Sequence, residues 1–98
     1  MLKTFRRIVC KDGASVSVQA GRAIYCTPRN DQGPWTHLEA GFPSVAPPES
    51  WLEYMDGDGD PLEQVYGYMP VACVQEFIDA HGGMIDGELP SFAPEVQP

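Results

Sequence analysis

The chain has 98 residues, which is enough for one domain and too short for two. Six Lys and Arg against fourteen Asp and Glu give a net charge of -8 and a pI near 4.4. This excess of acid excludes a protein that coats nucleic acid by neutralising phosphates with a basic surface. A hydrophobic content of 43% excludes a fully disordered acidic chain.

Four strands are predicted in the first half of the chain from its alternation of apolar and polar residues. Residues 4–10 and 14–20 are expected to form a hairpin about Asp12-Gly13, because glycine accepts a positive φ at a tight turn. Residues 22–27 and 35–42 predict two further strands, separated by a loop rich in turn residues.

The second half of the chain predicts two helical segments and one more strand. Residues 49–55 suit a short helical turn, and residues 64–69 are aromatic and β-like. Residues 70–81 predict an amphipathic helix that begins at Pro70 with one apolar stripe. Gly82-Gly83 is expected to end this helix, because glycine adopts the left-handed conformation of a C-cap.

These elements together predict an α+β fold. The sheet is expected to have four or five mostly antiparallel strands, with the amphipathic helix packed on one face. Residues 1–88 are expected to form a single domain. The Pro-rich segment 89–98 is expected to be a disordered tail.

Neither a secretory signal nor a membrane span is predicted, since no apolar run of sufficient length is present. Cys10, Cys26 and Cys73 are odd in number and widely spaced, which is a poor basis for disulfides. We therefore expect a reducing, cytoplasmic location, with the cysteines serving as small buried hydrophobes. No cofactor and no metal ion is predicted.

Charge is distributed unevenly along the chain. All six basic residues lie within residues 1–29, together with a single acid, Asp12. Thirteen acids and no Lys or Arg follow from Asp31 onward. Such asymmetry predicts a polarised surface that attracts a partner of opposite charge. The alternative is that the basic strands and the acidic elements pack together and neutralise each other.

The densest acid occurs where Asp56, Asp58 and Asp60 alternate with glycines. Alternate residues of an extended loop are about 6.5 Å apart, which is close to the phosphate spacing along a nucleic-acid strand. We therefore expect the loop to imitate a phosphate backbone and to contact a basic protein groove. The predicted partner-binding residues comprise charged side chains and two partly exposed aromatic anchors: Glu49, Trp51, Glu53, Tyr54, Asp56, Asp58, Asp60 and Glu63. A solvated loop with no partner is the alternative.

The sequence gives weaker indications of a calcium site and of a catalytic cysteine. The acidic loop resembles the start of a calcium loop, but Pro61 stands where the turn requires glycine and Gly67 where a bidentate Glu is needed. A cysteine paired with His37 or His81 would suit nucleophilic catalysis, yet no family signature surrounds any cysteine. We therefore do not predict an enzyme, and a calcium-binding module remains an alternative.

Several short motifs carry a resemblance to a known group of proteins. They are Ile8-Val9-Cys10-Lys11-Asp12-Gly13, Tyr25-Cys26-Thr27-Pro28-Arg29, Gly41-Phe42-Pro43-Ser44, Val65-Tyr66-Gly67-Tyr68-Met69-Pro70-Val71, Phe77-Ile78 and His81-Gly82-Gly83. Together they resemble small proteins of about this length encoded by tailed phages and prophages, over roughly residues 4–83. The resemblance implies a phage product made in a bacterial host, and it brings no catalytic residues.

The sequence thus predicts a small acidic phage protein whose work is binding. By analogy of size and charge with anti-CRISPR proteins, we expect it to inhibit a host nucleic-acid-binding defence complex without binding nucleic acid itself. A structural or assembly accessory of the phage particle is the alternative. The oligomeric state is left open by the sequence.

Overall fold

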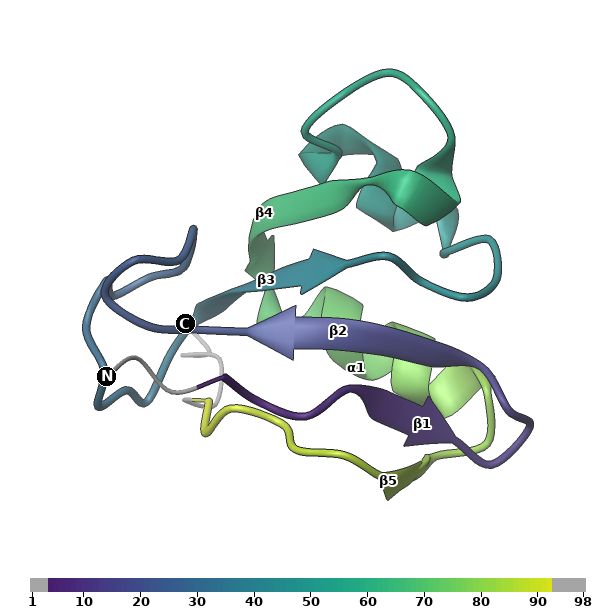
Figure 1. Ribbon diagram of the computed structural model, residues 1–98, viewed down its shortest axis with the longest axis horizontal. Coiled ribbons are helices and arrows are strands. Elements are labelled where there is room, and N and C mark those ends of the chain that lie inside the picture. The colour runs from purple at the N-terminus through teal and green to yellow at the C-terminus, as the bar shows by residue number, and fades with distance from the viewer. Residues whose placement is uncertain (1–3, 93–98) are drawn as a thin grey trace, which may run out of the picture.

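The computed structural model describes residues 4–92 and has an α+β architecture, as predicted. Its sheet has five antiparallel strands in the order β4-β3-β2-β1-β5 (Figure 1). The strands are β1 (Ile8–Cys10), β2 (Ser15–Gln19), β3 (His37–Gly41), β4 (Val65–Pro70) and β5 (Met84–Asp86). The helix α1 (Val71–Ala80) covers one face of the sheet, while the short 3-10 helices η1 (Glu49–Tyr54) and η2 (Pro61–Glu63) lie beyond β4.

The predicted hairpin is confirmed, because β1 and β2 pair antiparallel around Asp12 and Gly13. The Gly13 N–H donates to the Cys10 carbonyl at 2.9 Å, with Gly13 at φ +94°. The Asp12 carboxylate accepts the Ala14 N–H at 2.9 Å and so closes the turn. Glycine is needed here because the left-handed conformation costs other residues backbone strain.

The amphipathic helix is also confirmed, and it begins one residue later than predicted. Pro70 ends β4 and serves as the N-cap, so Val71 is the first helical residue. The buried residues of α1 are Val71, Val74, Phe77 and Ile78, which form the predicted apolar stripe.

The end of α1 is a Schellman motif. The Gly83 N–H donates to the Ile78 carbonyl at 2.9 Å, and the Gly82 N–H donates to the Asp79 carbonyl at 3.3 Å. Both glycines have positive φ, near +90° and +96°. The Gly82-Gly83 pair therefore ends the helix as expected.

The strand predicted at residues 22–27 is wrong. Local hydrogen bonds turn the chain there, from the Ile24 N–H to Gly21 and from the Cys26 N–H to Ile24. Only Thr27 makes a ladder contact, an isolated bridge to His37. Regular pairing fails because these short-range bonds use the backbone groups that a strand would offer to its neighbour.

The predicted disordered tail begins too early. Pro90 is fully buried, and Leu89 and Phe92 pack against the core. The Trp35 N–H also donates to the Ser91 carbonyl at 3.0 Å. The domain therefore extends through residue 92, and residues 93–98 lie outside the described part. None of the helices within residues 4–92 is long and apolar enough to cross a membrane.

Candidate interaction surface

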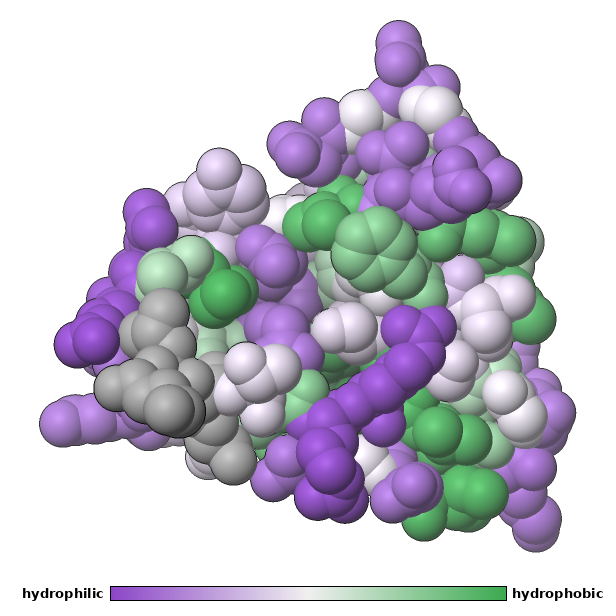
Figure 2. Space-filling view, viewed as in Figure 1, coloured by the Kyte–Doolittle hydropathy of each residue, from purple (hydrophilic) through white to green (hydrophobic). Residues whose placement is uncertain are grey.

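The acidic segment, residues 49–63, projects from the outer edge of β4. It consists of η1, the loop 56–60 and η2, at the top of Figure 1. Figure 2 shows that hydrophilic side chains cover this end of the molecule. All the predicted acidic contact residues are exposed: Glu49, Glu53, Asp56, Asp58, Asp60 and Glu63.

These carboxylates have no cationic partner in the described part of the chain. The ion pairs found in residues 4–92 all lie elsewhere, so the basic strands do not neutralise the acidic segment. They join Arg6 to Asp86 and Glu88, and Arg22 to Asp31.

Trp51 belongs to the core, and the expectation that it is partly exposed is wrong. Its side chain is 0% exposed and lies with ring-centroid distances of 5.3 Å to Tyr66 and 5.2 Å to Phe77. The indole N–H donates to the Cys73 carbonyl at 2.9 Å, which satisfies its polar group. Trp51 therefore fixes η1 to the sheet and to α1, and cannot contact a partner directly.

Hydrogen bonds also hold both ends of the acidic loop to β4. The Asp56 N–H donates to the Val65 carbonyl at 2.8 Å. The Tyr66 hydroxyl donates to the Pro61 carbonyl at 2.6 Å, and burial raises the pKa of this phenol. The ends of the loop are thus fixed relative to the sheet.

The interior of the loop is filled by Gln64. A Cβ on Gly57 would lie 2.7 Å from the Gln64 side-chain oxygen, and one on Gly59 would lie 3.0 Å from its nitrogen. The Asp60 carboxylate accepts the Leu62 N–H at 2.9 Å and caps η2. The glycines therefore allow a close approach, and the loop presents its acids from a defined framework.

Apolar side chains adjoin the acids. Tyr54 is half-buried, whereas Leu52 and Leu62 are 44% and 37% exposed. Partial burial raises the pKa of the Tyr54 phenol, and the carboxylate of Glu53 adds to the rise. Of the predicted anchors, Tyr54 alone reaches the surface. The two leucines were not predicted, because nothing in the local pattern shows which apolar residue of a short helix is buried.

The structure provides no ready cation site in this segment. Within residues 4–92, no three His, Cys, Asp or Glu side chains converge to hold a metal ion. One oxygen of Asp60 is already used as the cap of η2. The calcium alternative therefore gains no support from the geometry.

Cys10 and Cys26 are buried, and neither makes a hydrogen bond to a histidine within residues 4–92. Burial and the charge of Asp12 raise the pKa of the buried Cys10 thiol, which favours the unreactive protonated form. The Cys26 thiol is buried and bonds to the Gly21 carbonyl at 3.2 Å. His81 binds the Asp12 carboxylate at 2.7 Å.

A depression of about 270 Å³ lies on the exposed side of β2, lined in part by Gln19 and Asp31. The Gln19 and Asp31 side chains are already used within the chain. The Gln19 amide exchanges two hydrogen bonds of 2.8 Å with the Phe5 backbone, and Asp31 pairs with Arg22. These two side chains are therefore held by partners within the chain.

A second exposed feature is the tyrosine pair, Tyr25 and Tyr68. The rings stack with centroids 5.7 Å apart and an interplanar angle of 27°. They are 47% and 45% exposed. The guanidinium carbon of Arg29 lies 5.9 Å from the Tyr25 ring centroid, within the range of a cation–π contact.

A β-bulge in β4 positions Tyr68. Leu38 pairs with Met69 and Ala40 pairs with Tyr66, so β4 has one extra residue between these pairs. Tyr68 adopts φ +51°, and its N–H donates to the Tyr25 carbonyl at 3.0 Å. A left-handed bulky residue costs on the order of 1–3 kcal/mol, and such strain is concentrated at functional sites.

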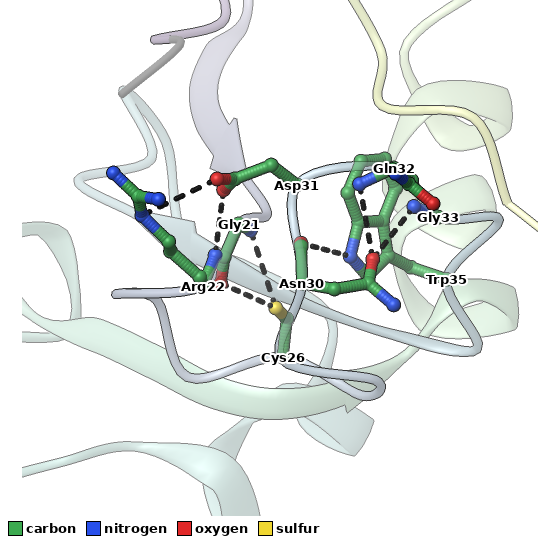
Figure 3. A network of polar contacts seen from close by, with 8 residues as sticks. All are labelled: Gly21, Arg22, Cys26, Asn30, Asp31, Gln32, Gly33 and Trp35. Carbon is green, nitrogen blue, oxygen red and sulfur yellow. Dashed lines mark hydrogen bonds and ion pairs between the residues drawn. The ribbon is translucent and has the colours of Figure 1, made fainter. Parts of the chain in front are cut away.

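A polar network supports the loop that carries Tyr25 (Figure 3). The Asn30 side-chain oxygen accepts N–H groups from Gln32 and Gly33, and the Trp35 indole donates to the Asn30 carbonyl at 3.2 Å. Asp31 pairs with Arg22, while Cys26 bonds to Gly21. The loop is irregular in its backbone but extensively bonded.

Comparisons of this chain with protein-family models, with curated proteins and with solved structures find no match.

Proposed function

We propose that the protein inhibits a nucleic-acid-binding protein by inserting the acidic segment into its basic groove. One observation carries the proposal: six exposed carboxylates between residues 49 and 63 have no cationic partner within residues 4–92. Burial of Trp51 and the bonds to β4 hold these charges in position. A preorganised array loses little conformational freedom on binding, which favours affinity.

The chemistry of the surface supports a protein partner. Leu52, Leu62 and Tyr54 supply apolar and aromatic area beside the acids, as a protein–protein interface requires. The net charge of -8 opposes direct binding of nucleic acid. A partner with a Lys- and Arg-lined groove is complementary in both respects.

The resemblance to small phage proteins gives this proposal its setting. The partner would be a defence complex of the bacterial host, and the protein would act in the manner of an anti-CRISPR inhibitor. Its acidic surface would exclude the nucleic acid that the complex must bind.

The test is affinity capture from a bacterial lysate at low and high salt, using three forms of the protein. One is unaltered, one carries Asp56→Asn, Asp58→Asn and Asp60→Asn, and the control carries Glu76→Gln, Asp79→Asn and Asp86→Asn. Both variants lose three negative charges from exposed positions. The control substitutions weaken the Ser50–Glu76 hydrogen bond and the Arg6–Asp86 ion pair, but they leave the carboxylates of the loop 56–60 in place. We expect the unaltered protein and the control to capture a nucleic-acid-binding protein at low salt, and the loop variant to lose it.

A particle accessory is the second candidate, and one feature favours it. β5 is an edge strand with Ile85 65% exposed, and such an edge can pair with another chain. Recovery of the protein in purified particles, with equal capture by all three forms, would favour this role and contradict the inhibitor.

A further inference from the structure

The tyrosine pair presents an aromatic surface that the acidic-groove proposal does not use. Each ring is about half exposed, and Arg29 already approaches Tyr25. Tyr68 contacts no cation within residues 4–92. The Tyr68 ring is therefore available to a cation of a partner. The left-handed backbone of Tyr68 costs folding free energy, and packing of a half-exposed ring does not explain that cost. A binding role for the ring would explain it.

The tyrosine pair and the acidic segment are both held to β4. The Asp56 N–H donates to the Val65 carbonyl, and the Tyr68 N–H at the bulge donates to the Tyr25 carbonyl. The two features are therefore fixed to the same strand.

A carboxylate lies directly at the tyrosine pair. Glu39, which is opposite the bulge on β3, accepts the Tyr25 N–H at 3.3 Å and makes no ion pair within the described residues. An aromatic face next to a carboxylate suits a guanidinium, which stacks on the ring and donates to the oxygen. Lysine lacks the planar group that stacks in this way.

We propose that the tyrosine pair, with Glu39, binds an arginine side chain at the rim of the partner's basic groove. This inference rests on the proposed function for the identity of the partner. Charge complementarity favours an arginine over a nucleobase, because the net charge of -8 repels the phosphates attached to the base. The bulge has the effect of turning Tyr68 onto Tyr25 to form the stacking surface.

The Tyr68 ring can be removed or conserved by substitution. Tyr68→Gly removes the ring and keeps the left-handed backbone, whereas Tyr68→Phe keeps the aromatic face. The probes are a tetra-arginine peptide, a tetra-lysine peptide and a single-stranded oligonucleotide of thymidines. Binding is followed by NMR shifts of the tyrosine rings, and circular dichroism verifies that each variant is folded.

We expect tetra-arginine to bind more tightly than tetra-lysine and to shift both tyrosine rings. Tyr68→Gly should weaken arginine binding about three- to tenfold and lower the preference over lysine, while Tyr68→Phe should bind like the unaltered protein. Equal binding of both peptides, an unchanged Tyr68→Gly variant, or tighter binding of the oligonucleotide at the rings would overturn the inference.

The Asp56→Asn, Asp58→Asn, Asp60→Asn variant separates the two proposals. If this variant loses binding of both peptides while Tyr68→Gly changes nothing, the acidic surface stands and the arginine site fails. If Tyr68→Gly loses the arginine preference while the loop variant binds fully, the arginine site stands and the acidic surface fails.

Discussion

Tyr68 allows the strained bulge to be tested by comparing two small replacements, Tyr68→Ala and Tyr68→Gly. Both remove the ring and its stacking on Tyr25, so these losses cancel in the comparison. The left-handed φ of +51° costs alanine roughly 1–2 kcal/mol and costs glycine little. Glycine lowers the free energy of unfolding by about 0.4–1 kcal/mol relative to alanine, because it gives the unfolded chain more conformational freedom. Tyr68→Gly should therefore be about 0.5–1 kcal/mol more stable than Tyr68→Ala.

Urea unfolding of the two variants measures this difference as a shift in midpoint at constant slope. Thermal unfolding should place Tyr68→Gly about 2–8 °C higher, given the size of the chain. Ser17 in β2 is the matched control, since its φ is not positive. There the order should reverse, with Ser17→Ala more stable than Ser17→Gly by roughly 0.5–1 kcal/mol. If Tyr68→Ala is also more stable than Tyr68→Gly, the left-handed conformation at position 68 is wrong. The argument that the bulge turns the Tyr68 ring onto Tyr25 then fails.

Three further predictions concern the framework of the molecule. Trp51→Ala should lower the free energy of unfolding by about 3–5 kcal/mol, whereas Leu52→Ala should cost about 1 kcal/mol or less; similar losses would contradict the assignment of Trp51 to the core. Gly87→Ala should destabilise strongly in urea, because φ is +100° and a Cβ would lie 2.3 Å from the Arg7 carbonyl oxygen; an unchanged midpoint would refute this close approach. The hydrogen bond to Ala14 and the one to His81 lower the pKa of Asp12 below its ordinary value near 3.8, so its stabilisation is present above that pH and disappears as the pH falls through the lower folded value. Between pH 6 and pH 2 the unaltered protein should therefore lose more stability than Asp12→Asn, and equal losses would show that Asp12 does not contribute.

The parts of the fold that the sequence predicts correctly are those with strong local signals. Asp12-Gly13 specifies a turn, and the apolar spacing from Val71 to Ile78 is sufficient to indicate a buried helix face. Gly82-Gly83 marks the end of that helix for the same conformational reason. In each case the determining interaction spans only a few residues.

The errors occur where distant contacts determine the structure. Trp51 is buried because η1 packs against both Tyr66 and Phe77, which local spacing does not reveal. The strand β5 has three residues and depends on pairing with β1. The ordering of Pro90 likewise depends on the core beneath it.

The exposed acids of the acidic segment could be predicted from composition, whereas the tyrosine pair could not. Exposed acids follow from a charged, Gly-rich loop, whereas the stacking of Tyr25 on Tyr68 depends on a bulge and an irregular loop meeting in space. Gly67 is the residue from which the bulge beside Tyr68 could have been predicted. A glycine within an aromatic strand indicates a bulge or a close approach, and here a Cβ would lie 3.1 Å from the Tyr25 Cβ.

The most direct test of the central claim is competition between this protein and nucleic acid for the captured partner. A labelled oligonucleotide is bound to that partner and then displaced by increasing protein. The unaltered protein and the Glu76→Gln, Asp79→Asn, Asp86→Asn control should displace it, and the Asp56→Asn, Asp58→Asn, Asp60→Asn variant should require at least about tenfold more, with displacement weakening as salt rises. Equal displacement by all three forms, or binding that leaves the oligonucleotide in place, would contradict the proposal that the acidic segment occupies the nucleic-acid groove.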